Sequence, residues 1–267
     1  MFMGELRTEH FGRAVRVVRE TASTIDVARQ WLREEEADGA VVIAETQTRG
    51  RGRRGRHWAS PRGGLWLSVI ARPGMESARA GRLGLGMGLA AAEAVSAEVE
   101  AHGAETHGVE CVVGLKWPND LMIGGRKVGG VLVEAETDGK RITEAVLSLG
   151  LNANLSVRDL PEEVRESATT LRDETGREHR IEVLAARVLE NLERAWPEIV
   201  GGGEELAEKW RARDVLMGRE VSAEVGGAAV RGRANGIDAD GALVITASGG
   251  ERRLFSGEAA VVRIVGR

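Results

Sequence analysis

The chain alternates between two hydrophobic periodicities over residues 23–213. Apolar residues recur at helical spacing over 23–36, 82–100, 181–196 and 204–213, whereas short β-branched runs predict buried strands. The predicted strands cover 40–44, 65–70, 109–116, 121–123, 128–134 and 142–149. Gly124 and Gly125 lie between two of these strands and predict a hairpin turn. Strands and helices in this mixed order favour an α+β fold with one mixed β-sheet and its helices on one side.

The pattern changes after Met217. Between 219 and 264, short strand-like runs alternate with turn signals at 226–227, 235–236, 240–241 and 249–250. Strands at this spacing predict a small β-barrel of about fifty residues. We therefore expect two domains, residues 1–217 and residues 218–267.

Composition and charge narrow the functional classes. The 37 basic and 41 acidic residues give a net charge of -4, which argues against a protein that is basic over its whole surface. The single cysteine, Cys111, excludes an internal disulfide and a multi-cysteine metal site, and is expected to be buried. The N-terminus carries no apolar signal segment, and no apolar run is long enough to span a bilayer. These features predict a cytoplasmic protein without membrane partners.

Residues 49–56 place five arginines among eight residues, soon after a predicted strand. Guanidinium groups bind phosphate and carboxylate oxygens, and the interleaved glycines let a ligand approach the backbone. The spacing of Gly50, Gly52 and Gly55 also matches the dinucleotide-binding fingerprint, but residues 58–64 continue as a loop where that fingerprint requires a helix. Two interpretations remain: an anion-binding loop of an active site, or a solvated patch that binds nucleic acid.

A second polar stretch, residues 116–120, closes a predicted strand with the sequence Lys-Trp-Pro-Asn-Asp. Asn119 and Asp120 offer oxygen ligands suited to Mg²⁺ or to a nucleotide. Lys127 opens the next strand, which would hold its ammonium group at the edge of the sheet. The alternative is a turn rich in proline, asparagine and aspartate, followed by a solvated lysine.

Together, the two stretches resemble one family, the biotin–protein ligases. The family's Gly-Arg-Gly-Arg-x-x-Arg-x-Trp loop is matched by residues 50–58, and its Lys-Trp-Pro-Asn-Asp segment is matched in full by residues 116–120. Residues 129–134 and 150–154 are also similar to family segments. The resemblance covers residues 20–265 approximately, and it implies a catalytic ligase domain followed by an SH3-like C-terminal barrel.

The resemblance implies an activity with two steps. The carboxylate of biotin attacks the α-phosphate of ATP to give biotinyl-5′-AMP, and a lysine of the biotin carboxyl carrier protein of acetyl-CoA carboxylase then takes the biotinyl group. Lys127 and Arg53 are the implied catalytic residues. The implied biotin-binding residues are Ser23, Thr24, Ile25, Gln47, Arg51, Gly52, Arg53 and Lys127.

One position departs from the family pattern. In the family, a Ser-Thr-Asn sequence at the start of the first catalytic helix binds biotin, and Ile25 stands where the asparagine is expected. An isoleucine side chain neither donates nor accepts a hydrogen bond, so only the backbone of this residue is left to contact biotin.

The nucleotide site is implied by the same resemblance. Candidates for binding ATP and the adenylate are Arg51, Arg53, Lys116, Trp117, Asn119, Asp120 and Asn152, and Asn119 and Asp120 are also the candidate Mg²⁺ ligands. Only about twenty residues precede the first predicted helix, too few for a helix-turn-helix, so we expect no sequence-specific DNA binding. The sequence leaves open whether the chain forms a homodimer. Two alternative functions also stay open, a lipoate-type protein ligase and a nucleic-acid-binding module built on the arginine loop.

Overall fold

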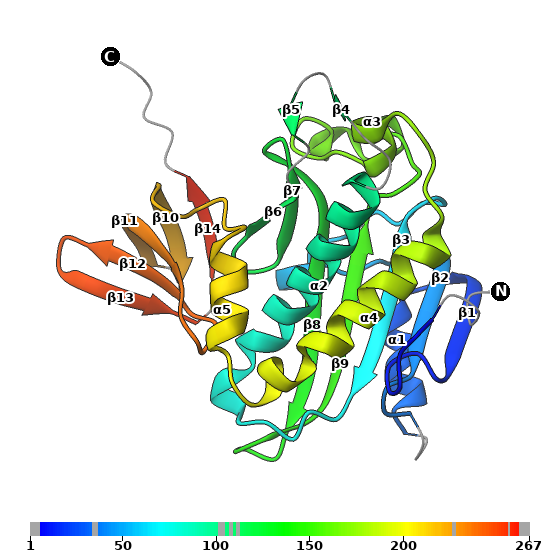
Figure 1. The fold of residues 1–267 in the computed structure, drawn as a ribbon, viewed down its shortest axis with the longest axis horizontal. Helices are drawn as coiled ribbons and strands as arrows, with labels where there is room; N and C mark the ends of the chain where they lie inside the picture. The colour runs from blue at the N-terminus through cyan, green and yellow to red at the C-terminus, as the bar shows by residue number, and fades with distance from the viewer. Residues whose placement is uncertain are drawn as a thin grey trace.

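A seven-stranded mixed sheet forms the body of the larger part of the molecule (Figure 1). The strand order is β1-β2-β3-β9-β8-β7-β6, in which β1 pairs in parallel with β2 and the other neighbours pair antiparallel. The computed structural model describes residues 6–33, 37–100, 105–106, 109–110, 113–225, 228–255 and 257–261. The strands are β1 (Val15–Thr21), β2 (Val41–Gln47), β3 (Leu65–Ala71), β6 (Val113–Lys116), β7 (Asp120–Ile123), β8 (Arg126–Thr137) and β9 (Ile142–Leu151), and β4 (Glu105–Thr106) pairs with β5 (Val109–Glu110) apart from this sheet.

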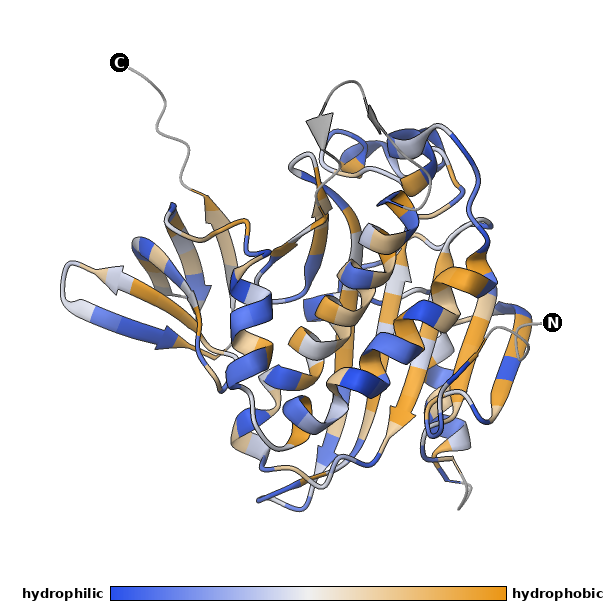
Figure 2. Ribbon diagram, in the orientation of Figure 1, coloured by the Kyte–Doolittle hydropathy of each residue, from blue (hydrophilic) through white to orange (hydrophobic). Residues whose placement is uncertain are grey.

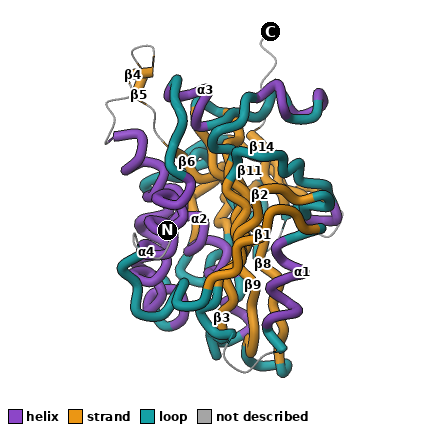
Figure 3. The backbone as a smooth tube through the Cα atoms, turned by 90° about the vertical axis from the view of Figure 1, so that its right-hand side faces the viewer, coloured by secondary structure: helices purple, strands orange, loops and turns teal. Residues whose placement is uncertain are grey.

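Helices cover both faces of the sheet, as Figure 3 shows. α2 (Gly81–Glu100) and α4 (Ile181–Val200) lie on one face, and α1 (Thr24–Trp31) lies on the other. The prediction of helices on one side was therefore wrong. Successive side chains of a strand point to opposite faces, so Val41 joins the core under α2 whereas Val42 joins the core under α1. The remaining helices are α3 (Leu171–Thr175) and α5 (Glu204–Arg211), with 3-10 turns η2 (Arg53–Gly55), η3 (Ser77–Arg79), η4 (Val157–Asp159) and η5 (Glu162–Val164).

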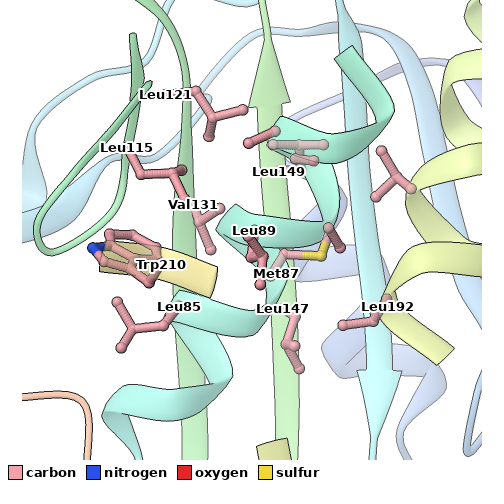
Figure 4. Close-up of a cluster of buried hydrophobic side chains, with 14 of the residues drawn as sticks. Leu85, Met87, Leu89, Leu115, Leu121, Val131, Leu147, Leu149, Leu192 and Trp210 are labelled. Carbon is pink, nitrogen blue, oxygen red and sulfur yellow. The ribbon is translucent and has the colours of Figure 1, made fainter. Parts of the chain in front are cut away.

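The main core lies between the sheet and the layer formed by α2 and α4. Figure 2 shows apolar residues gathered along the central strands and on the inward faces of these helices. In Figure 4, Met87 of α2 lies over Leu147 of β9, and both side chains are fully buried. A Cβ at Gly86 would collide with Ile199, so the glycine allows α2 and α4 to approach each other closely.

The C-terminal residues form a second, five-stranded antiparallel sheet of order β13-β12-β11-β10-β14. The prediction of a turn at 235–236 was wrong, because these residues lie inside β11, where a register shift between Ala234 and Ile237 marks a bulge. The expected domains, 1–217 and 218–267, stay a prediction, although the second sheet begins near their boundary. Its strands are β10 (Glu220–Val225), β11 (Ala228–Ile237), β12 (Leu243–Ala247), β13 (Gly250–Leu254) and β14 (Glu258–Val261).

Buried polar contacts join the small sheet to the larger part. The Nε of Arg82 donates a hydrogen bond to the Ala239 carbonyl over 2.6 Å, and its guanidinium pairs with Asp240 at 3.3 Å. The indole N–H of Trp117 donates to the Gly241 carbonyl over 3.2 Å. Because Arg82 and Trp117 are both buried, the turn after β11 is held firmly against the start of α2 and against the segment that carries residues 116–120.

Two local elements differ from the expected ones. The first helix spans Thr24–Trp31 instead of 23–36, and Ser23 caps it by accepting a hydrogen bond from the backbone N–H of Ile25 at 3.3 Å. Strand β1 was not predicted, because charged and apolar residues mix along it and none of its residues is fully buried. A half-exposed edge strand carries only a weak hydrophobic signal.

Two further expectations fall on residues outside the described ranges, namely the turn at 226–227 and the burial of Cys111. Within the described ranges, no helix combines the length and the apolar character needed to cross a membrane.

Candidate active site

A cavity of about 810 Å³ lies between the start of α1, the loop that follows β2, strands β6 to β9 and the C-terminal sheet. Every residue that the sequence marked as a candidate for biotin or nucleotide binding lines this cavity. The structure thus brings together positions from five separate stretches of sequence, while their individual binding roles stay predictions. These residues are Ser23, Thr24, Ile25, Gln47, Arg51, Gly52, Arg53, Lys116, Trp117, Asn119, Asp120, Lys127 and Asn152.

The start of α1 and the end of β2 are locked together at the cavity wall. The Oε1 of Gln47 accepts hydrogen bonds from the backbone N–H of Thr24 at 2.8 Å and from its hydroxyl at 3.2 Å. The Nε2 of Gln47 donates to the hydroxyl of Ser60 over 2.8 Å. Thr24 and Ser60 are buried, so the amide of Gln47 has one fixed orientation.

Both the backbone N–H and the side chain of Ile25 take part in the fold. Its backbone N–H is the donor to the Ser23 hydroxyl in the helix cap. Its side chain is 3% exposed and packs in the core under α1 with Ala28, Val42 and Ile70. The residue therefore contributes an apolar surface to the cavity, and its backbone N–H is already engaged.

The arginine loop folds back on itself over residues 50–58. The N–H of Gly52 donates to the Arg56 carbonyl at 2.8 Å, and the N–H of Trp58 donates to the Gly50 carbonyl at 2.9 Å. Gly50 is required here, because a Cβ at this position would collide with the backbone of Trp58. The loop thus presents successive arginines in one short, closed turn.

Carboxylates from two other elements hold Arg51. Its guanidinium pairs with Asp26 of α1 at 2.8 Å and with Glu134 of β8 at 3.3 Å. Its Nε is buried and has no hydrogen-bond partner within the described residues. The charge of Arg51 is therefore balanced by acidic residues of α1 and β8.

Arg53 connects the loop to the C-terminal sheet. Its guanidinium donates to the Gly257 carbonyl at 3.0 Å and to the side-chain oxygen of Asn119 at 3.4 Å. Burial, followed by the neighbouring charge of Arg54, lowers the pKa of Arg53, whereas Asp120 acts in the opposite direction. An arginine remains charged under such a shift, so Arg53 is a desolvated cation beside the cavity.

Lys127 lies close to the end of the arginine loop. Its ammonium pairs with Asp120 and sits 5.1 Å from the centre of the Trp58 ring. The backbone of Lys127 is held by two hydrogen bonds, a donation to the Ser167 carbonyl at 2.8 Å and an acceptance from the Thr169 N–H at 2.9 Å. The lysine and the loop therefore converge on one region of the cavity.

The other nucleotide candidates differ in how freely they can act. Trp117 is 2% exposed and its indole N–H is engaged by Gly241, so it acts mainly as a tether to the C-terminal sheet. The Nδ2 of Asn152 donates to the Thr169 carbonyl at 3.0 Å, whereas its Oδ1 is buried without a partner within the described residues. Lys116 is half-buried at the cavity wall. Asn152 thus has an acceptor available for a ligand.

The predicted Mg²⁺ ligands are already engaged with cations. The Oδ1 of Asp120 binds Lys127, and the Oδ1 of Asn119 accepts from Arg53. The Nδ2 of Asn119 donates to the Val131 carbonyl at 2.8 Å, which fixes the orientation of the amide. Among the described residues there is no group of three or more histidine, cysteine, aspartate or glutamate side chains that could hold a metal ion. The donor set fits an ion that brings phosphate ligands of its own, but does not form a complete cage.

The structure adds cavity residues that the sequence did not mark. One wall consists of Leu160, Val164 and Ala168 from the loop after β9, and Ser222 and Ala259 come from the C-terminal sheet. No contiguous motif carries these residues, so fold topology alone brings them to the cavity. Ser148 also lines the cavity, and the only sequence signal for it is a polar residue within the otherwise apolar run 145–151.

Family comparisons agree with this geometry. Residues 16–152 match the Biotin/lipoate A/B protein ligase family, and residues 216–262 match the Biotin protein ligase C terminal domain. The Biotin--[acetyl-CoA-carboxylase] ligase of Mycobacterium tuberculosis is 36% identical over 241 residues, which cover 89% of this chain and 85% of that protein. The Bifunctional ligase/repressor BirA of Bacillus subtilis is 29% identical over 255 residues, which cover 95% of this chain and 75% of that protein.

Solved structures show the same fold. The biotin protein ligase from Aquifex aeolicus in complex with biotin and ATP matches with a TM-score of 0.77 and 28% identity, covering 94% of this chain and 99% of that one. The agreement extends over both sheets. Sequence matches to two ligase domains and a shared fold along nearly the whole chain place this protein in the biotin protein ligase family.

Proposed function

We propose that this chain activates biotin with ATP to biotinyl-5′-AMP and transfers biotin to a lysine of the biotin carboxyl carrier protein of acetyl-CoA carboxylase. Membership of the family supports the reaction class, because two relatives are named biotin--[acetyl-CoA-carboxylase] ligase. The observation that carries the proposal furthest is the convergence of the arginine loop, Lys127 and the Thr24–Gln47 pair on one cavity. That arrangement offers cations for two anionic substrates beside a rigid polar wall.

In the first step, a carboxylate oxygen of biotin forms a bond to the α-phosphorus of ATP while the bond to pyrophosphate breaks. The carboxylate and the phosphates repel each other, so the step needs cations that face both. At ~4 Å and an effective dielectric constant near 20, unlike unit charges attract by roughly 4 kcal/mol. Lys127, which pairs with Asp120, and Arg53, which contacts Asn119, supply such charges.

We assign Mg²⁺ to the same step as a partner of the triphosphate. When bound, the ion would neutralise charge on the phosphate oxygens. Asp120 would give it one carboxylate oxygen and Asn119 one amide oxygen, with phosphates and water completing the shell. The residues fit this limited role because both side chains face the cavity from one short segment.

In the second step, the amine of the carrier lysine attacks the acyl carbon of biotinyl-5′-AMP, an amide bond forms, AMP leaves and the amine loses a proton. The mixed anhydride must be kept from water until the carrier arrives. Arg51, anchored at both Asp26 and Glu134, holds the loop across the cavity and supports this protection.

Labelling of a carrier tests the proposal. The chain is incubated with biotin, Mg-ATP and an apo carrier domain, and the carrier is analysed by mass spectrometry. We expect one biotinyl group on one lysine. Transfer of lipoate instead of biotin would establish the lipoate-type alternative, and the absence of both labels would refute the proposal.

The nucleic-acid alternative receives less support from the geometry. Arg51 and Arg53 line the cavity, and both are already paired with protein groups, so these two guanidinium groups are not free to bind a nucleic acid backbone. The nucleic-acid alternative would require tight binding of RNA or DNA. The logarithm of the binding constant would then fall against the logarithm of the salt concentration with a slope of about 0.7–0.9 per phosphate contact. The absence of sequence-specific DNA binding, the cytoplasmic location and the oligomeric state stay open predictions.

A further inference from the structure

A line of buried hydrogen bonds runs beneath the cavity and joins four elements. Ser68 of β3 and Ser148 of β9 lie directly opposite each other in the sheet, with their hydroxyl oxygens 2.8 Å apart. The Ser68 hydroxyl is also 2.8 Å from the hydroxyl of Thr24, which contacts Gln47. Gln47 then continues the line to Ser60. Both strands are otherwise apolar around their serines, so these hydroxyl groups form an isolated polar path through the core.

The backbone fixes the direction in which this path donates its protons. The N–H of Thr24 can only donate, so the Gln47 atom that it contacts must be the amide oxygen. The Thr24 hydroxyl contacts the same oxygen, and it must therefore donate its single proton there. Because that proton is committed, Thr24 can only accept from Ser68.

The same counting extends to the end of the path. Ser68 has given its one proton to Thr24, so it can only accept from Ser148. Ser148 in turn gives its proton to Ser68. Ser148 lines the cavity and is 8% exposed, and the oxygen that it presents there has lone pairs but no proton left to donate.

We propose that Ser148 is a specificity-determining acceptor that selects a ligand N–H, and that Ser68 is the positioning residue that makes it an acceptor only. This inference rests on the proposed function, in which the ligand is biotin. Its cyclic urea offers N–H groups on a rigid ring, and one of them would donate to Ser148. A ligand with an oxygen in that place would set two acceptors against each other in a buried site, which forfeits the hydrogen bond and leaves both groups unsatisfied.

Calorimetric titration with biotin and two cyclic carbamate analogues tests the proposal. In each analogue, one of the two ureido N–H groups is replaced by a ring oxygen. We expect the chain to bind at least one analogue about 30-fold more weakly than biotin, as for a buried acceptor left without its donor. Equal affinity for biotin and both analogues would overturn the inference while leaving the proposed function intact. Failure to bind biotin at all would overturn both.

Variants separate positioning from simple structural support. In Ser68→Ala, the proton of Ser148 is released and can be donated to the ring oxygen, so the penalty for that analogue should fall to about threefold while biotin binds nearly as before. A merely structural role would weaken both ligands together. Ser148→Ala should also remove the difference in affinity between biotin and the analogue, because it weakens the binding of biotin alone. This variant provides the test if Ser68→Ala does not fold.

Ser60→Ala is the matched control, because Ser60 lies beyond Gln47 and does not set the direction of the upstream protons. Its hydroxyl donates to the Trp58 carbonyl at 3.1 Å and accepts from Gln47. We expect this variant to keep the ratio of analogue to biotin affinity seen in the unmodified chain. A ratio that is unchanged in Ser68→Ala, or one that collapses equally in Ser60→Ala, would overturn the proton order inferred here.

Discussion

Replacing Lys127 by methionine removes one charge from the cavity and keeps a side chain of similar length beside the Trp58 ring. The ammonium of Lys127 pairs with Asp120 and lies 5.1 Å from the ring centre. Its backbone is held by hydrogen bonds on both sides, so the substitution leaves the strand in place. The perturbation is therefore confined to the electrostatics of the adenylation step.

The magnitude follows from Coulomb's law and the exposure of the side chain. An ammonium about 4 Å from an anionic oxygen contributes roughly 4 kcal/mol at an effective dielectric constant near 20. The Lys127 side chain is 30% exposed, and discounting for solvent screening leaves about 2 kcal/mol. At 1.36 kcal/mol per tenfold in rate, Lys127→Met should slow adenylate formation roughly 30-fold.

Single-turnover release of pyrophosphate from ATP in the presence of biotin measures this step directly. Lys209→Met is the matched control, because Lys209 pairs with Glu205 at 2.6 Å on the surface of α5, away from the cavity. The control should keep the rate of the unmodified chain. A Lys127→Met rate within twofold of that value would remove Lys127 from the chemistry, and equal slowing of both variants would show that the effect is not local.

Three further predictions concern stability and the cavity wall. Burial raises the pKa of Asp214 to about 6 from 3.8, and its Oδ2 is buried without a partner within the described residues, so the carboxyl favours folding only while protonated. The free energy of unfolding should therefore fall, relative to Asp214→Asn, as the pH rises from about 4 to above 6, by about 2 kcal/mol in urea titrations; a pH-independent difference would contradict this. A Cβ added by Gly150→Ala would lie 2.6 Å from the Trp58 indole nitrogen, so this variant should lower kcat/KM for biotin about tenfold. The control Gly84→Ala should leave kcat/KM unchanged, because its Cβ would meet its first neighbouring atom only at 3.8 Å. Equal effects of the two variants would contradict this prediction. Arg82→Ala removes a buried guanidinium that holds the C-terminal sheet and should cost about 3 kcal/mol of stability in the same urea assay, and a loss below about 0.5 kcal/mol would disprove that role.

Elements with strong periodicity could be predicted from the sequence, and weakly patterned ones could not. The twenty-residue helix α2 and the apolar strand β3 were predicted within two residues of their bounds. Strand β1 was not predicted, because it is an edge strand whose residues alternate irregularly between charged and apolar types. The Asn235–Gly236 pair is a strong turn signal, yet it forms a bulge inside β11, because the bulge uses the same tolerance of positive φ that a turn requires.

The site divides in a similar way. Residues within contiguous motifs, such as those of the arginine loop, could be named from the sequence, because the chemistry and the spacing occur together. The hydroxyl pair of Ser68 and Ser148 could not, because its members are 80 residues apart and only the register of β3 against β9 brings them together. The contact of Trp117 with Gly241 spans 124 residues and depends on how the C-terminal sheet packs. Long-range placement is therefore what the structure contributes.

The exchange of labelled pyrophosphate into ATP reports adenylation at this cavity without any carrier protein. We expect exchange that requires biotin and Mg²⁺, stops when biotin is omitted, and falls sharply in Lys127→Met. Exchange that proceeds with lipoate but not with biotin, or no exchange with either acid, would contradict the claim that this cavity joins biotin to AMP.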